Sequence, residues 1–230
     1  MKFCNRLRPA LHTRFEAFNS GFRALGYKES SADKCDFLLI WNRRAMDHTL
    51  AKACEARGGT VLVAENAAWG NDFMGGHWCS LARGFHNERW RFKQGGDERW
   101  DSLNVPLAQW RPEGGEIIGL PQRGIGLHGH AMPLDWVPKG CTRIRKHPGA
   151  RPCKPLEDDL AQASKVVTWG SGAAIKALMW GIRVESHMPN WIGEQDNTDD
   201  GRLAMLRRLA WAQWRIAEIE SGEAIRWAIS

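Results

Sequence analysis

The sequence has no apolar run long enough to cross a membrane, although it is 230 residues long and 43% hydrophobic. A membrane-spanning helix needs about 20 consecutive apolar residues. The first residues, 1–9, also lack the apolar core of a secretory signal peptide. These absences favour a globular protein with no membrane span, and by default we expect a cytoplasmic location.

Several motifs with a defined chemistry are also missing. The six cysteines are scattered without a Cys-x-x-Cys pair, so we expect reduced thiols and no metal. A metal site built from Cys141, Cys153, His128 and His130 is a weaker alternative. There is no Gly-x-x-x-x-Gly-Lys-Ser/Thr loop and no Gly-x-Ser-x-Gly turn, which argues against the commonest phosphotransferases and hydrolases.

The sequence is instead rich in positive charge and in tryptophan. Its formal net charge is +6, and it has 13 tryptophans against a single tyrosine. A basic surface favours a polyanionic partner or an anionic substrate, although a merely soluble basic protein fits the same charge. Tryptophans in polar segments, such as Trp90 and Trp136, can stack on bases or sugars, but most are expected to pack in the core.

The hydrophobic pattern predicts an α/β fold. Apolar residues at helical spacing alternate with short continuous apolar runs, which are typical of strands buried on both faces of a parallel sheet. Helices are predicted at 11–25, 45–57, 156–163, 173–180 and 201–229, and strands at 35–41, 60–65, 116–120, 142–145, 165–168 and 182–185. No regular element is predicted between residues 66 and 113.

A Ser/Gly turn at residues 170–172 stands between a predicted strand and an Ala-rich helix. Backbone amides at the start of such a helix bind phosphate, and the helix dipole favours the negative charge. The alternative is that Ser171 only caps the helix while the glycines only allow close packing.

A second polar segment, Arg-Ile-Arg-Lys-His-Pro at residues 143–148, covers the end of the strand predicted at 142–145 and the residues just after it. Ligands of open α/β sheets bind at the carboxyl ends of the strands. A histidine there can donate to a phosphate or protonate a leaving group. Together with the Ser/Gly turn, His147 predicts an anion site.

In these two segments the sequence resembles the His-Pro and Ser/Thr motifs of bacterial sialyltransferases and capsule-type Kdo transferases. It is also similar to short glycosyltransferase-like proteins of bacteriophages. The resemblance implies a GT-B-like α/β fold of two small Rossmann-like lobes with a C-terminal helix packing across them. The implied domains are an acceptor-side lobe (1–115), a nucleotide-sugar-binding lobe (116–200) and the C-terminal helix (201–230).

The resemblance also assigns residues. Pro-Gln-Arg-Gly at 121–124 is similar to the family's Gly-Gln loop. Glu65 matches the first acidic residue of the family's Glu-Asp-Gly-Phe segment, and the three residues after it are Asn-Ala-Ala in this sequence. By this match Glu65 and His147 are the catalytic candidates. The implied donor-binding residues are Gln122, Arg123, Arg145, Lys146, Pro148, Trp169, Ser171 and Gly172.

The predicted function is therefore transfer of a sugar from a nucleotide-sugar to an acceptor hydroxyl, with no metal or other cofactor required. A surface polysaccharide is one candidate acceptor. Double-stranded DNA with hydroxymethylated pyrimidines is another candidate acceptor. In that case Arg83, Arg89 and Arg91 would contact the DNA. The alternative function is a non-catalytic nucleotide- or nucleic-acid-binding protein on a degenerate GT-B scaffold.

Overall fold

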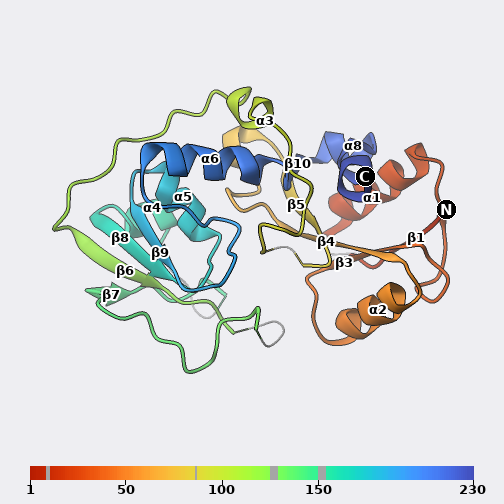
Figure 1. Ribbon diagram of the computed structural model, residues 1–230, viewed down its shortest axis with the longest axis horizontal. Helices are drawn as coiled ribbons and strands as arrows, with labels where there is room; N and C mark the ends of the chain where they lie inside the picture. The colour runs from red at the N-terminus through yellow and green to blue at the C-terminus, as the bar shows by residue number, and fades with distance from the viewer. Residues whose placement is uncertain (9–10, 86, 125–128, 150–153) are drawn as a thin grey trace. The chain divides into compact units, whose positions relative to one another are not determined.

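The computed structural model in Figure 1 describes residues 1–8, 11–85, 87–124, 129–149 and 154–230. By internal contacts the chain divides into two compact units, which we name the N-terminal unit (Met1–Gly95 with Ala210–Ser230) and the central unit (Gly96–Leu209). Each unit has its own sheet. The domain bounds predicted from the sequence, 1–115, 116–200 and 201–230, stay a prediction.

The sheet of the N-terminal unit has the strand order β10-β5-β4-β3-β1-β2. Its strands are β1 (Lys2–Asn5), β2 (Lys28–Glu29), β3 (Phe37–Trp41), β4 (Thr60–Asn66), β5 (Trp78–Arg83) and β10 (Gln213–Arg215). The first four pair in parallel, as expected, whereas β5 and β10 extend the sheet with antiparallel pairing. The parallel α/β arrangement predicted from the sequence is therefore confirmed, with an antiparallel edge added.

Helices cover both faces of this sheet because its central strands are apolar on both sides. Every residue of β3 from Phe37 to Ile40 is buried. Helix α2 (Ala45–Ala56) packs its Ala51 and Cys54 against one face of β3 and β4. On the other face Phe3 of β1 stacks on Phe22 of α1 (His12–Ala24), with ring centroids 4.5 Å apart. Figure 1 shows α1 and α2 on opposite sides of the strands.

The C-terminal segment is not the single helix predicted for residues 201–229. It consists of α6 (Asp199–Ala210), β10, α7 (Ile216–Glu220) and α8 (Glu223–Ile229). The helix is interrupted because Gln213 is fully buried and its side-chain amide bonds Ser80 and the Ala68 N–H, partners it reaches only from the sheet edge. Tertiary hydrogen bonding here overrides a local helical pattern.

The central unit has an all-parallel sheet in the order β7-β6-β8-β9. Its elements are α3 (Glu98–Asp101), β6 (Glu116–Leu120), β7 (Arg143–Ile144), α4 (Leu156–Asp159), β8 (Ala163–Thr168), α5 (Ala173–Met179), β9 (Arg183–Ser186) and most of α6. The helix predicted at 156–163 is shorter than expected because Ala163 is already part of β8.

The strand order of the central unit reverses direction next to β6. From β6 the chain moves to β7 on one side and then returns to β8 on the other. The loops after β6 and β8 therefore lead to opposite sides of the sheet, which is the topological switch point where open α/β sheets bind ligands.

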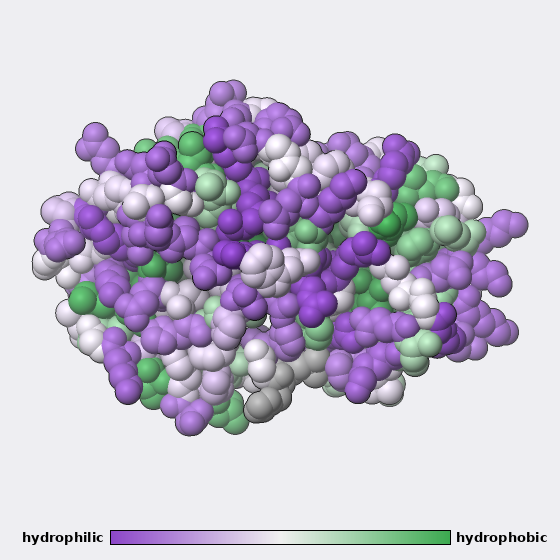
Figure 2. All heavy atoms as spheres, viewed as in Figure 1, coloured by the Kyte–Doolittle hydropathy of each residue, from purple (hydrophilic) through white to green (hydrophobic). Residues whose placement is uncertain are grey.

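Among the described residues no helix is long and apolar enough to cross a membrane. Hydrophilic side chains cover most of the face drawn in Figure 2, and hydrophobic ones lie on it in separate patches.

Candidate functional site

Three loops meet at the carboxyl edge of the central sheet. Gln122 and Arg123 follow β6, His147 follows β7 and Ser171 follows β8. The loop after β6 contacts both neighbours: the Gln122 side-chain amide donates to the Gly170 carbonyl oxygen at 3.4 Å, and Arg123 donates to the Gly149 carbonyl oxygen at 3.5 Å. The structure therefore brings the residues predicted on these three loops to one edge.

The Ser171 turn is held by the buried hydroxyl of Thr168. This hydroxyl donates to the Leu120 carbonyl oxygen and accepts from the Ser171 N–H, both at 3.0 Å. The hydroxyl of Ser171 in turn accepts from the Ala173 N–H at 3.2 Å. Gly172 occupies the cap position of α5, so Ser171 lies one residue before it with a half-buried side chain, and Gly172 is exposed.

His147 is half-buried, and its Nδ1 accepts from the Gly149 N–H at 2.9 Å. In the neutral ring the proton is then on Nε2, because each nitrogen of a neutral imidazole has a different role. Burial lowers the pKa of His147, and the nearby Arg123 and Arg145 charges lower it further. The ring is therefore neutral near pH 7, and it presents an N–H donor in a positively charged setting that favours an anion.

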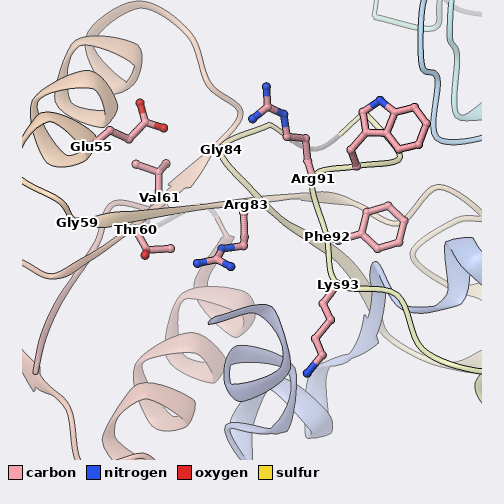
Figure 3. A pocket seen from close by; sticks show the side chains of 10 residues that line it. Glu55, Gly59, Thr60, Val61, Arg83, Gly84, Arg91, Phe92 and Lys93 are labelled. Atoms are coloured by element: carbon pink, nitrogen blue, oxygen red, sulfur yellow. The ribbon is translucent and has the colours of Figure 1, made fainter. Parts of the chain in front are cut away.

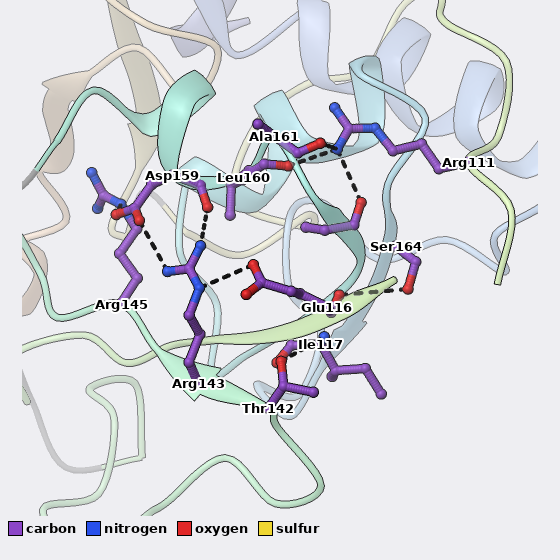
Figure 4. Close-up of polar contacts among 11 residues, drawn as sticks. Arg111, Glu116, Ile117, Thr142, Arg143, Arg145, Asp159, Leu160, Ala161 and Ser164 are labelled. Atoms are coloured by element: carbon purple, nitrogen blue, oxygen red, sulfur yellow. Dashed lines mark hydrogen bonds and ion pairs between the residues drawn. The ribbon is translucent and has the colours of Figure 1, made fainter. Parts of the chain in front are cut away.

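Arg145, in contrast, is buried against Asp159. Its Nε lies 2.7 Å from Oδ2 of Asp159, at an angle outside that of a hydrogen bond, and its Nη2 donates to the Lys154 carbonyl oxygen at 2.9 Å. Arg143 holds the other oxygen of Asp159 at 2.9 Å and also Glu116 at 3.0 Å, as Figure 4 shows.

This network anchors the loop after β7, and Arg145 adds positive potential to the site from below the surface. Its direct contact with a phosphate stays a prediction. Lys146 and Pro148 are exposed on the same loop.

An aromatic cluster lies beside this edge, and sequence reasoning named its two tryptophans but missed His187. The ring of Trp136 meets the ring of Trp169 edge to face, with centroids 6.0 Å apart, and that of His187 at 5.6 Å. His187 also contacts Glu185 at 3.0 Å, and Lys165 pairs with the other oxygen of Glu185 at 2.6 Å. The position of His187 directly after β9, at the same edge of the sheet, is the signal that could have predicted it.

The hydrogen bond from Lys165 lowers the pKa of Glu185, and burial opposes that shift. Glu185 is therefore ionised near neutral pH, and it can orient the His187 ring by accepting its N–H. The cluster offers aromatic faces and a fixed imidazole close to the loop that bears Ser171.

Glu65 belongs to the N-terminal unit, where it lies half-buried at the carboxyl end of β4 opposite Ser80. The side-chain oxygen of the next residue, Asn66, accepts from Arg14 at 3.4 Å and from Asn71 at 2.9 Å. Glu65 is therefore at the carboxyl edge of its own sheet, in a polar environment.

The metal site considered from the sequence falls partly outside the described residues, because Cys153 and His128 are not among them. Within the described ranges no group of three or more His, Cys, Asp or Glu side chains is placed to hold a metal ion.

The fold is GT-B-like, which is the architecture of a large class of glycosyltransferases. The fold class expected from the sequence is therefore confirmed. The chain resembles KpsC of Thermosulfurimonas dismutans, a beta Kdo 2,4 transferase, with a TM-score of 0.57 over 93% of this chain and 91% of that chain. Identity is 14%, so the likeness concerns the fold. No known family profile and no curated protein sequence matches the chain.

Proposed function

We propose that this protein is a glycosyltransferase that binds a nucleotide-sugar donor at the carboxyl edge of its central sheet. The observation that carries the proposal is the meeting of the loops after β6, β7 and β8 at the switch point of a GT-B-like fold. A neutral histidine and a Ser/Gly turn are both present at that point.

In this proposal the donor phosphates lie between His147 and the Ser171 turn. Nε2 of His147 donates to a phosphate oxygen, while the hydroxyl of Ser171 and the exposed backbone at Gly172 provide further polar contacts. As the bond between the sugar C1 and the phosphate oxygen breaks, negative charge accumulates on the departing nucleotide. Donors that are already in place stabilise that charge without reorganisation, and this is the main source of the expected rate acceleration.

The acceptor oxygen forms the new bond to C1 and loses its proton to a carboxylate. Glu65 is the proposed base, because it lies at the carboxyl edge of the N-terminal sheet and an ionised carboxylate can accept that proton. The acceptor is a hydroxyl group. A surface polysaccharide hydroxyl is the first candidate from the sequence, in keeping with a structural neighbour that is named as a Kdo transferase, and a hydroxymethylated pyrimidine in DNA is the second.

The first experiment is a thermal-shift screen with CMP, UDP, GDP and their sugar conjugates. A ligand that binds only the folded state raises the melting temperature by mass action. We expect one nucleotide to stabilise the protein, and His147→Asn to weaken its affinity about 10-fold or more, since a hydrogen bond to a charged group contributes about 1.5 to 3 kcal/mol. His12→Asn, an exposed histidine on α1, is the matched control and should change nothing.

The catalytic claim is tested separately with Glu65→Gln, which keeps the shape of the side chain and removes the charge. An enzyme should lose turnover in this variant while keeping its affinity for the nucleotide. If no nucleotide stabilises the protein, or if turnover survives in Glu65→Gln, the proposal fails at the donor site or at the base, respectively. Nucleotide binding without turnover against any acceptor would support the non-catalytic alternative.

A further inference from the structure

Three side chains form a row across neighbouring strands at the carboxyl end of β4. In the sheet of the N-terminal unit, β10 is next to β5 and β5 is next to β4. Gln213 of β10 lies directly opposite Ser80 of β5, and Ser80 lies directly opposite Glu65 of β4. Both pairings are antiparallel, so these side chains share one face of the sheet, with neighbouring Cβ atoms about 4.5 to 5.5 Å apart. Ser80 therefore stands between Gln213 and the predicted base.

The row is separate from a pocket of about 500 Å³ at the other end of the same strands, which Figure 3 shows. That pocket is formed where β4 begins, at Thr60 and Val61, and where β5 ends, at Arg83. Glu65 is four residues beyond Val61 along β4, which corresponds to about 13 Å in a strand. A substitution in the row therefore leaves the pocket intact, and Thr60 offers a hydroxyl on the same strand for comparison.

Two members of the row are buried and joined by a hydrogen bond. Gln213 is fully buried, and only 5% of Ser80 is exposed. Nε2 of Gln213 donates to the Ser80 hydroxyl at 3.3 Å, and Oε1 of Gln213 accepts from the Ala68 N–H at 2.9 Å. Ala68 belongs to the loop that follows β4. Gln213 therefore holds both the residue opposite Glu65 and the loop that comes directly after it.

The proton of the Ser80 hydroxyl is left over in this arrangement. A serine hydroxyl has one donor and two acceptor positions, and Gln213 occupies an acceptor position. Among the residues that the structure describes, no group accepts the proton of this hydroxyl. Buried donors in proteins nearly always have an acceptor, so an exception calls for an explanation. The Glu65 carboxylate lies across from Ser80 on the side away from Gln213, and a change of rotamer brings a glutamate at this spacing to the hydroxyl.

We propose that Ser80 is a positioning residue for Glu65: its hydroxyl donates to one oxygen of the carboxylate and directs the other oxygen to the acceptor hydroxyl. This inference rests on the proposed role of Glu65 as the base. A hydrogen bond from a hydroxyl to a carboxylate is shorter and stronger than one between neutral groups. It fixes the carboxylate at the reaction distance, and a misplacement of about 1 Å can lower a rate about 100-fold.

Gln213 sets the direction of these hydrogen bonds. Because its amide is the donor towards Ser80, the Ser80 proton is directed to the other neighbour in the row, Glu65. A carboxylate in place of the amide accepts that proton instead and turns it away from Glu65. Gln213→Glu therefore reverses the direction of the bond, while its second oxygen still accepts from the Ala68 N–H.

The test is the steady-state release of nucleotide from CMP-N-acetylneuraminic acid, UDP-glucose and GDP-mannose by the full chain, with water as the acceptor. Ser80→Ala should lower kcat at least about 5-fold and change KM less than about 2-fold, because the hydroxyl acts on the base while the donor binds to other loops. Gln213→Glu should lower kcat as much. In Glu65→Gln, the further substitution Ser80→Ala should cause no additional loss, since the two residues act as a unit.

Two variants are matched controls for the loss of a hydroxyl. Ser164→Ala removes another buried strand hydroxyl, which donates to the Glu116 carbonyl oxygen at 3.5 Å in the central sheet. Thr60→Val removes a hydroxyl from the far end of β4. Both variants should keep kcat within about 2-fold of the wild type.

A second measurement needs no turnover. The urea midpoints of Ser80→Ala, Glu65→Ala and the double variant form a cycle, and the shift of the double variant should be smaller than the sum of the single shifts. Additive shifts would overturn the contact between Ser80 and Glu65. An unchanged kcat in Ser80→Ala, or an equal loss in Ser164→Ala, would overturn the positioning role. If the wild type turns over none of the three nucleotide-sugars, the proposed function fails, and the urea cycle still decides whether Ser80 holds Glu65.

Discussion

The buried hydroxyl of Thr168 offers the sharpest test of how the edge of the central sheet is built. Thr168→Val keeps the shape of the side chain and removes only its hydrogen-bonding group. In the wild type this hydroxyl bonds the Leu120 carbonyl oxygen and the Ser171 N–H, both at 3.0 Å, and Thr168 is fully buried. The substitution therefore leaves two backbone groups without that partner.

The expected cost follows from those two bonds. A typical hydrogen bond contributes about 1 kcal/mol net, and an unsatisfied buried group costs about 1 to 3 kcal/mol. Leu120 is buried, so its carbonyl oxygen gains no water in exchange, whereas Ser171 is half-buried and its N–H can reach solvent. We therefore expect Thr168→Val to lower the free energy of unfolding by about 2 to 3 kcal/mol.

The sequence provides a matched control at Thr142. Its hydroxyl also makes two backbone bonds, donating to the Ile117 carbonyl oxygen at 3.0 Å and accepting from the Ile117 N–H at 3.1 Å. Thr142 is exposed, so water replaces the lost partner, and we expect Thr142→Val to cost less than about 1 kcal/mol.

Urea unfolding of the two variants measures the difference as a shift in midpoint at unchanged slope. Thr168→Val should also weaken nucleotide binding, because the Ser171 turn loses its anchor. Equal losses of stability in the two variants would refute the reasoning, since burial would then make no difference to the cost of a lost hydroxyl.

Three further outcomes follow from the geometry. Burial and neighbouring arginines lower the pKa of His147 in the free protein, and a bound phosphate would raise it, so nucleotide affinity should increase as pH falls below the raised pKa, by at most about 10-fold per pH unit. The affinity of His147→Asn, measured by titration with the nucleotide at each pH, should lack that dependence. Gly181→Ala should lower the free energy of unfolding by more than about 3 kcal/mol, because Gly181 has a φ of 72° and a Cβ would collide with the Gln109 carbonyl oxygen. Gly140 has a similar φ of 69° but lies in open space, so Gly140→Ala should cost about 1 to 2 kcal/mol. Arg145→Met removes one of the two arginines that pair with the partly buried Asp159. Because Arg143 still compensates that carboxylate, the loss should be smaller than the roughly 3 kcal/mol of an unpaired buried charge, about 1 to 2 kcal/mol in urea unfolding, and no measurable loss would show that the Arg145 pair contributes little.

Local patterns predicted the central elements of both sheets well. The runs at 37–41 and 60–66 form strands because their apolar residues are buried on both faces, and that pattern is visible without knowledge of any partner. The strand β5 was not predicted, because Ser80 interrupts its apolar residues. Ser80 is nevertheless buried, since Gln213 from the far end of the chain donates to its hydroxyl at 3.3 Å.

The residues of the candidate site could be named from the sequence, and their roles stay a prediction. The Ser/Gly turn and the His-Pro segment are short motifs, so their residues could be named from the sequence, and the parallel sheet explains why they meet. The pairing of Arg145 with Asp159 could not be predicted, because it joins two separate segments and depends on how α4 packs. The contact of Trp136 with Trp169 and His187 likewise joins three separate loops.

The sequence by itself determined the α/β class, the positions of most central strands and the two motifs at the carboxyl edge of the central sheet. These depend on the periodicity of apolar residues and on turn chemistry, which act over a few neighbouring residues. Only the tertiary structure decided the antiparallel edge with β10, the burial of Arg145 and the pocket around Arg83. Each of those depends on pairing between residues far apart in the chain, and the free energy of such contacts is not encoded in any local pattern.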